Sequence, residues 1–219
     1  LSAIVARQPT HKLKSAGRKG GASWRKVPVW ALYVVGFVPA LWYFWLGATG
    51  QIPGNAIKEF EHLLGIWALR FLIATLLVTP LRDLASINLM RYRRALGLLA
   101  FWYVVMHFAT YVVLDKGVNL AVILDDIGKR PFITIGMACL VLLLPLALTS
   151  NAFSIRRLGK NWLLLHRLAY VIVLGGAVHY AMSLKVVTSE PLIYLALAVL
   201  LVLYRPLRPL IRKRRGSRR

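Results

Sequence analysis

Apolar segments of helix length recur along this sequence, and they constrain its fold more than any other feature. A helix needs about 20 apolar residues to cross the roughly 30 Å hydrocarbon core of a bilayer, where its backbone groups must bond internally. The final segment is short, at roughly 14 residues, so we expect it to extend into residues 186–187 or 207–211. The sequence predicts an all-α, polytopic membrane helix bundle. Its six predicted transmembrane helices are residues 27–46, 60–80, 95–114, 131–149, 162–182 and 191–204.

The composition agrees with this fold class. The chain is 58% hydrophobic and 16% charged, whereas a soluble domain is about 45–50% apolar and about 25% charged. No Gly-rich phosphate-binding turn follows a strand pattern, so we expect no soluble nucleotide-binding domain. Cys139 is the single cysteine, which excludes an intramolecular disulfide and a cysteine-ligated cluster.

Basic residues are distributed unequally between the connections. The two ends of the chain (residues 1–26 and 205–219) and the segments 81–94 and 150–161 hold 22 Lys and Arg and one acid, whereas the other three connections hold five basic residues and six acids. Because cytoplasmic segments carry the excess of Lys and Arg, both termini are predicted to be cytoplasmic. The asymmetry explains the formal charge of +22 without nucleic-acid binding. Residues 1–26 and 212–219 are interpreted as basic cytoplasmic tails, the first disordered and in contact with membrane lipid, around a transmembrane domain at residues 27–211.

Three histidines within the predicted spans are the main candidate site residues, because histidine is costly in an apolar span. His107 lies in the third span, and His166 and His179 lie in the fifth. A rise of about 1.5 Å per residue places His107 about 18 Å from the cytoplasmic side, His179 about 25 Å and His166 about 6 Å. His107 therefore pairs in depth with His179. Two neutral imidazoles on facing helices can hold a b-type haem, and the lack of C-x-x-C-H excludes c-type attachment.

His166 has no histidine of equal depth on the third span. Arg93 and Arg94 stand where a symmetrical two-haem cytochrome would have one. His166 can ligate a second haem with a non-histidine partner or none, or it can bind a haem propionate, a flavin or a quinone. On an ideal helix it lies about 140° from His179, and the intervening glycines at 175 and 176 can bend the helix.

Three arginines complete the candidate cofactor-binding residues. Arg70 falls midway along the second span, so we expect it to face the interior and to bind a haem propionate or an anionic cofactor. Arg93 and Arg94 open the third span, where they either set the topology or bind a propionate, a quinone or a flavin phosphate. His62, beside Glu61 at the outer end of the second span, is interpreted as an interfacial residue.

Three segments resemble the MsrQ (YedZ) family, the haem-binding membrane subunit of the bacterial periplasmic methionine sulfoxide reductase system. These segments are RRALGLLAFWYVVMHFATY, LGKNWLLLHRLAYVIVLGGAVHY and FLIATLLVTPLRDLA. The family belongs to the ferric-reductase-like transmembrane group. The resemblance implies a multi-pass protein of the bacterial inner (plasma) membrane. It also implies haem-iron ligation by His107, His166 and His179, although the missing fourth histidine departs from the regular two-haem stack of the wider group.

The resemblance further implies electron transfer across the membrane through haem b, with FMN as a second cofactor. The electron donor would be the quinone pool or a cytosolic flavin reductase. The acceptor would be MsrP, a periplasmic molybdopterin enzyme that reduces methionine sulfoxide in oxidised proteins. The chain would then be a non-catalytic subunit of an oxidoreductase complex.

Other functions stay open from the residues alone. A ferric or quinone reductase-type cytochrome b would use the same histidines. A proton or anion transporter would line a path with them, but we see no internal repeat that favours this class. A purely structural assembly subunit would need none of them. A visible spectrum of the purified protein separates these functions.

Overall fold

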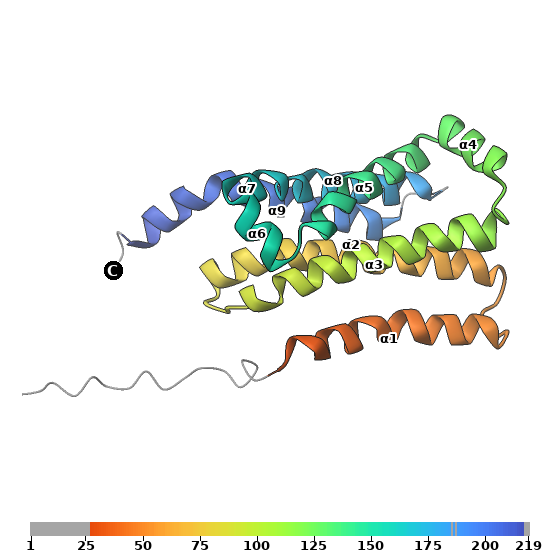
Figure 1. The fold of residues 1–219 in the computed structure, drawn as a ribbon, viewed down its shortest axis with the longest axis horizontal. Helices are drawn as coiled ribbons and strands as arrows, with labels where there is room; N and C mark the ends of the chain where they lie inside the picture. The colour runs from red at the N-terminus through yellow and green to blue at the C-terminus, as the bar shows by residue number, and fades with distance from the viewer. Residues whose placement is uncertain (1–26, 185, 187, 217–219) are drawn as a thin grey trace, which may run out of the picture.

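The computed structural model describes residues 27–184, 186 and 188–216, so the predicted tail at residues 1–26 lies outside the described part. Within that part every regular element is helical, and six helices are long and apolar enough to cross a membrane. They run side by side (Figure 1). The all-α membrane bundle is therefore confirmed. Its spans are formed by α1 (Val29–Ala48), α2 (Ala56–Leu84), α3 (Arg93–Ala109) with the π-helical turn η3 (Thr110–Asp115), α5 (Pro131–Leu148), α7 (Lys160–Leu165) with α8 (Leu168–Ser183), and α9 (Ser189–Gly216).

The two ends of the bundle differ in charge. We call the end with residues 85–92, 149–159 and the C-terminal turns of α9 the basic end. We call the opposite end, with residues 49–55 and 116–130, the acidic end, because six of the seven acids of the chain lie toward it. The start of α1 and the end of α9 lie at the basic end (Figure 1).

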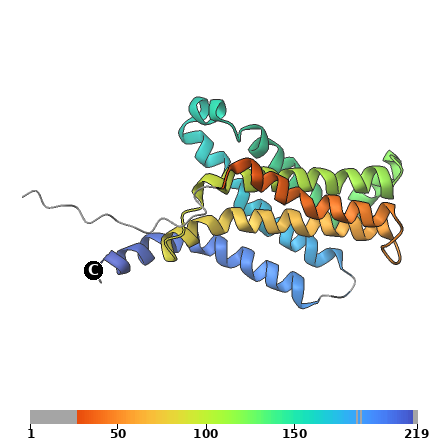
Figure 2. The ribbon, with the colours of Figure 1, turned by 90° about the horizontal axis from the view of Figure 1, so that it is seen from below.

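Helix α2 is the centre of the bundle. It contacts α1, α3, α8 and α9, and Figure 2 shows it between α9 and the pair formed by α1 and α3. Its Leu64 and Leu76 are buried together with Leu99 of α3 and Ile172 of α8. Asn55 begins the helix by accepting a hydrogen bond from the Lys58 backbone N–H at 3.1 Å, which satisfies a free donor of the first turn.

The outward faces of the bundle are apolar, as expected for a surface in contact with lipid acyl chains. Helix α1 presents the largest exposed side chains, and Tyr103 anchors it to the core by donating to the Gly36 carbonyl at 2.6 Å. Gly36 also lets α3 approach closely, because a Cβ there would lie 2.7 Å from Leu99. The exposed large residues of α1 include Trp30, Val34, Val35, Val38, Leu41, Trp42, Phe44 and Trp45.

Two segments predicted as loops contain short helices. Residues 115–130 include α4 (Leu120–Lys129), and residues 150–161 include α6 (Ala152–Leu158). Asn119 and Asn151 begin these helices, each accepting a hydrogen bond from a backbone N–H three residues later. Both segments are too short and polar to span a membrane, so the number of spans does not change.

The fifth and sixth spans also differ from the prediction. The fifth breaks at His166–Arg167, where Arg167 N–H bonds to Leu164 O, three residues back, and α8 then continues through the glycines at 175 and 176. The glycines at 175 and 176, named from the sequence as a place where the helix can bend, lie inside α8. The sixth, α9, extends past residue 211 to Gly216, so the tail predicted from residue 212 is helical at its start.

Candidate functional site

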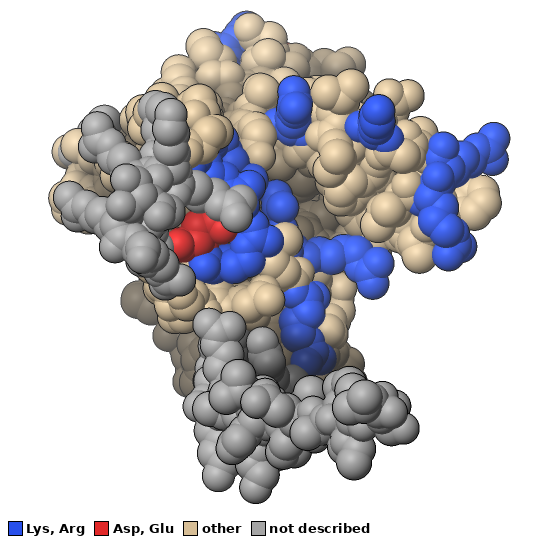
Figure 3. Space-filling view, turned by 90° about the vertical axis from the view of Figure 1, so that its left-hand side faces the viewer, with Lys and Arg blue, Asp and Glu red and all other residues tan. Residues whose placement is uncertain are grey.

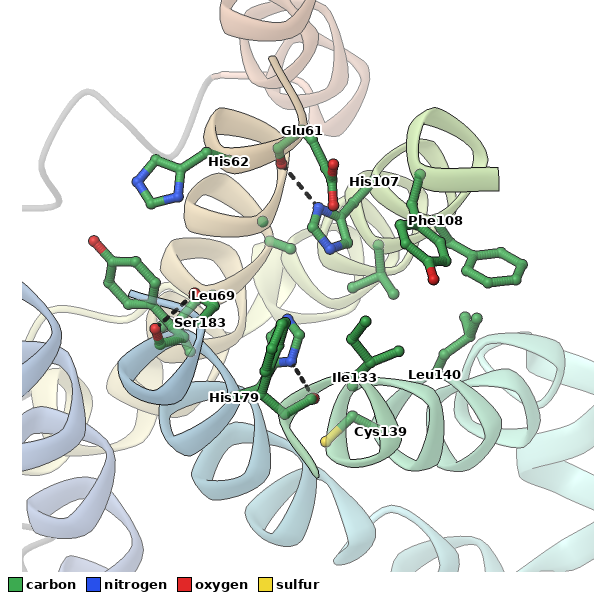
Figure 4. Close-up of a pocket in the computed structure, with 18 of the residues that line it drawn as sticks. Glu61, His62, Leu69, His107, Phe108, Ile133, Cys139, Leu140, His179 and Ser183 are labelled. Carbon is green, nitrogen blue, oxygen red and sulfur yellow. Dashed lines mark hydrogen bonds between the residues drawn. The ribbon is translucent and has the colours of Figure 1, made fainter. Parts of the chain in front are cut away.

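A cavity of about 910 Å³ opens between α2, α3, α5 and α8 in the half of the bundle toward the acidic end. Its volume lies within the usual range for cofactor pockets, about 300–1,000 Å³. Apolar side chains such as Leu69, Ile133 and Leu140 line most of it (Figure 4). The polar groups that reach it include His107 from α3 and His179 from α8. The cavity thus combines an apolar lining with two imidazoles.

His107 and His179 face each other across this cavity (Figure 4). Their ring centroids lie 6.2 Å apart, with ring planes at 86°. An imidazole nitrogen lies about 2 Å from a metal that it ligates, and the ring centre lies roughly 1 Å behind it, so two imidazoles on opposite sides of one metal have centroids roughly 6 Å apart. The observed separation matches this value. The structure therefore brings together the two histidines that were paired by depth.

Backbone carbonyls fix the orientation of both rings. His107 Nδ1 lies 2.8 Å from Glu61 O, and His179 Nδ1 lies 2.6 Å from Phe132 O. A carbonyl oxygen only accepts, so each Nδ1 carries the proton and donates it. Each Nε2 is then unprotonated and available as a metal ligand, which is the arrangement that metal-binding histidines usually adopt.

Two glycines make room for these rings. A Cβ at Gly136 of α5 would lie 2.8 Å from His179 Cε1, and a Cβ at Gly65 of α2 would lie 3.3 Å from His107 Cε1 and Nδ1. Sequence reasoning missed both residues. The available signal was their place within apolar helices, because a helix-interior glycine costs about 1 kcal/mol relative to alanine and needs a packing reason.

The described residues contain no group of three or more His, Cys, Asp or Glu side chains that could hold a metal ion. Two facing imidazoles alone do not form a stable cage for a free ion, whose structural sites take four protein ligands. They suit a metal that brings its own equatorial ligands, as haem iron does with axial histidine. The donor set, the separation of the rings and the apolar cavity therefore fit a haem better than a bare metal.

A chain of ion pairs lies at the acidic end of the cavity. Lys58 Nζ lies 2.8 Å from Asp115 Oδ2, Lys116 Nζ lies 2.9 Å from Asp126 Oδ2, and Arg130 Nε lies 3.0 Å from Asp126 Oδ1. Lys58, Lys116 and Arg130 also line the cavity. The hydrogen bond from Lys116 lowers the pKa of Asp126, and the same bond raises the pKa of Lys116. These pairs connect η3 and α4 to α2.

His62 was interpreted as an interfacial residue, but it also lines this cavity. Its ring lies against that of Tyr180 at 5.5 Å between centroids. In Figure 4 it is set apart from the His107–His179 pair. It is therefore a cavity residue that does not belong to the facing pair.

His166 lies elsewhere, toward the basic end, and is not among the residues that line the cavity. It stacks on Trp162 at 3.9 Å between centroids, and its Nε2 lies 3.1 Å from Thr149 Oγ1. Thr149 has one hydroxyl proton and donates it to Pro145 O at 2.6 Å, so it accepts from His166 Nε2–H. In this arrangement the Nε2 of His166 is protonated, unlike that of His107 or His179.

The three candidate arginines also lie outside the cavity lining. The Arg70 side chain is 41% exposed, donates from Nε to Tyr194 Oη at 2.7 Å and lies 3.6 Å from Glu190. Arg70 therefore contacts α9 and does not reach the cavity. Arg93 is half-buried beside Tyr170, and Arg94 is exposed near Tyr33 of α1.

Comparison with known proteins is consistent with this architecture. The model of the family described as "Ferric reductase like transmembrane component" matches residues 64–177, which include most of α2 and the whole of α3, α5 and α7. The chain is 66% identical over 180 residues to "Protein-methionine-sulfoxide reductase heme-binding subunit MsrQ" of Rhizobium meliloti (strain 1021), covering 82% of this chain and 83% of that protein. The chain belongs to the MsrQ family.

Two further MsrQ relatives give the same result. The proteins of that name from Brucella ovis and Brucella canis are each 60% identical over 191 residues, covering 87% of this chain and 87% of each relative. No solved structure matches the chain. Membership in MsrQ, a ferric-reductase-like family, confirms the resemblance seen in the sequence, and with the six apolar helices it makes the chain a multi-pass inner-membrane protein.

Proposed function

We propose that this chain is a haem-binding electron-transfer subunit of a methionine sulfoxide reductase system. The observation that carries the proposal is the facing pair of His107 and His179, with both Nε2 atoms available, in an apolar cavity. The printed name of the relatives, a haem-binding subunit of protein-methionine-sulfoxide reductase, supports the same function. Haem b, when bound, supplies a one-electron carrier.

The chain's own residues hold and tune this site. His107 and His179 would ligate the iron, and the Glu61 and Phe132 carbonyls keep both rings in the required tautomer. Lys58, Lys116 and Arg130 provide cations at the acidic end of the cavity, where they can pair with propionates. Apolar side chains line most of the rest of the cavity, which suits the apolar face of a haem.

The charges support an orientation of the chain in the membrane, and with it a proposed direction of electron transfer. The excess of Lys and Arg at one end supports a cytoplasmic location for the basic end and both termini. The cavity would then lie in the periplasmic half, next to a periplasmic acceptor. This acceptor is proposed to be the molybdopterin catalytic subunit of the reductase, MsrP-like. The chain itself carries out no substrate chemistry.

Electrons would enter at the basic end, from the quinone pool or from a cytosolic flavin reductase. His166 and Arg93 lie on this side and are close enough to interact electrostatically. We propose that they contact the entering electron carrier, a quinone or FMN, with Arg94 nearby. A second haem at His166 would require His166 Nε2 to lose its proton and its hydrogen bond to Thr149. Arg70 has partners on α9, so we assign it no cofactor contact.

Haem quantitation on histidine variants tests this function. The purified wild type should show a Soret band and a reducible alpha band, and His107→Ala and His179→Ala should each lose most of this haem. His62→Ala is the matched control, because His62 lines the same cavity without joining the facing pair. His166→Ala should keep the haem held by His107 and His179. A wild type without a Soret band, or equal haem retention in His107→Ala and His62→Ala, would reject the proposal.

A further inference from the structure

Arginines converge on one carboxylate at the basic end. Asp83 Oδ2 accepts from Arg208 Nε at 2.5 Å and from Tyr204 Oη at 3.3 Å, and its Oδ1 lies 3.3 Å from Arg82 Nε. Figure 3 shows basic side chains bordering the acidic atoms of this face. Both carboxylate oxygens are thus engaged by Arg82, Arg208 and Tyr204.

Two further arginines meet beside this group without a carboxylate. The guanidinium carbon of Arg205 lies 5.2 Å from the centroid of the Tyr170 ring, and Arg93 is near enough to Tyr170 to interact with it electrostatically. Arg93 and Arg205 are close enough to repel each other. Arg205 Nη2 is buried and has no hydrogen-bond partner among the described residues.

Among the described residues, no acidic side chain forms a salt bridge with Arg93 or Arg205, whereas Arg82 and Arg208 both pair with Asp83. The chain has seven acids, of which six lie toward the acidic end, and the seventh is Asp83. A buried donor without a partner and two like charges around one tyrosine are both unfavourable. An anion from outside the chain, bound between Arg93 and Arg205, would satisfy the donor and neutralise the charges.

The position and the donors indicate which anion fits. Arg93 begins α3, and Arg205 lies in the last turns of the α9 span, which ends at Pro209, so the pair lies near one membrane surface. Guanidinium groups bind phosphate oxygens through paired N–H donors. We infer that Arg93, Arg205 and Tyr170 form a phosphate-binding site at the basic end of the bundle.

Two kinds of molecule bring a phosphate group to the membrane surface at the basic end. One is the phosphodiester of an anionic phospholipid headgroup, and the other is the phosphomonoester of a soluble cofactor such as FMN. The cofactor source rests on the proposed function, whereas phosphate binding itself does not. The site is separate from the cavity of His107 and His179.

Ligand titration of the full-length protein in detergent tests the inference. The probes are phosphatidylglycerol in mixed micelles and FMN, with riboflavin as the phosphate-free control, followed by native mass spectrometry. Arg205→Gln and Arg93→Gln should each weaken binding of the phosphate-bearing probe by about 10- to 100-fold, the value of one or two charge-assisted hydrogen bonds. Arg156→Gln is the matched control, because it removes the same charge from an exposed residue on α6 at the same end of the bundle.

The outcomes are distinct. If Arg205→Gln and Arg93→Gln weaken the binding of phosphatidylglycerol alone, the site binds a lipid headgroup. If they weaken the binding of FMN alone, while riboflavin binds weakly to every variant, the site binds the phosphate of a cofactor. Unchanged binding of both probes by Arg205→Gln and Arg93→Gln, or an equal loss in Arg156→Gln, overturns the inference. If Arg205→Gln does not fold, Arg205→Lys keeps the charge, removes Nη2 and should still weaken binding. The Soret band reports the haem site separately, so failure of the proposed function is distinguishable.

Discussion

The substitution Gly136→Ala tests how closely the cavity is fitted to the orientation of His179. The added Cβ would lie 2.8 Å from His179 Cε1 and 2.9 Å from Nδ1, whereas ordinary contacts begin at 3.4 Å. The ring must therefore move by about 0.6 Å, the difference between these distances. The Phe132 carbonyl holds the ring at 2.6 Å, so this movement strains or breaks the bond that keeps Nε2 unprotonated.

The magnitude follows from these contacts. Overpacking a core costs about 1–3 kcal/mol, and losing the hydrogen bond costs about 0.5–1.5 kcal/mol. Alanine is about 1 kcal/mol more favourable than glycine inside a helix, which offsets part of the loss in folding stability. This gain does not restore the orientation of the His179 ring. Changes to groups that orient a metal ligand typically lower metal affinity by about 10- to 100-fold, and we expect this loss of haem affinity.

The assay is haem titration of the apoprotein, followed by the Soret band. Gly65→Ala should have a smaller effect, because its Cβ would lie 3.3 Å from the His107 ring. Gly97→Ala is the control, since its Cβ would meet only Thr75 Cγ2 at 4.0 Å. The expected order of haem loss is Gly136, then Gly65, then Gly97. Unchanged affinity in Gly136→Ala, or an equal loss in Gly97→Ala, would refute the reasoning.

Two further predictions concern stability. The bond from Lys116 lowers the pKa of Asp126 in the folded state. Asp126 therefore stabilises the fold at pH values above its ordinary pKa of 3.8, and this contribution is lost as the pH falls through the lower pKa of the folded state. Thermal unfolding of Asp126→Asn should therefore show a smaller loss of stability below about pH 4 than the wild type, because Asp83 and Asp115 keep ion pairs of their own that are still lost on protonation; the same acid sensitivity in both proteins would contradict this. Tyr103→Phe removes a buried hydroxyl bonded to Gly36 O and should cost about 1–2 kcal/mol in unfolding free energy without loss of haem, and an unchanged melting temperature would exclude this role.

Much of the architecture could be predicted from the sequence because lipid imposes a strict length and composition on each span. The short helices α4 and α6 were missed because their formation depends on local capping by Asn119 and Asn151 and not on span length. The partners of Arg70 could not be predicted, because its depth, but not its direction, follows from its position in the sequence. Its direction is set by Tyr194, which is 124 residues away in the chain.

The sequence by itself determined the number of spans, the unequal charge of the connections and the matching depths of His107 and His179. These follow from local rules, because the rise along a helix is the same whatever surrounds it. Only the tertiary structure decided that the two rings face each other 6.2 Å apart, that Gly136 and Gly65 leave room for them, and that His166 turns to Thr149. Rotation about each helix axis is set by packing between segments distant in sequence, and no local pattern records it.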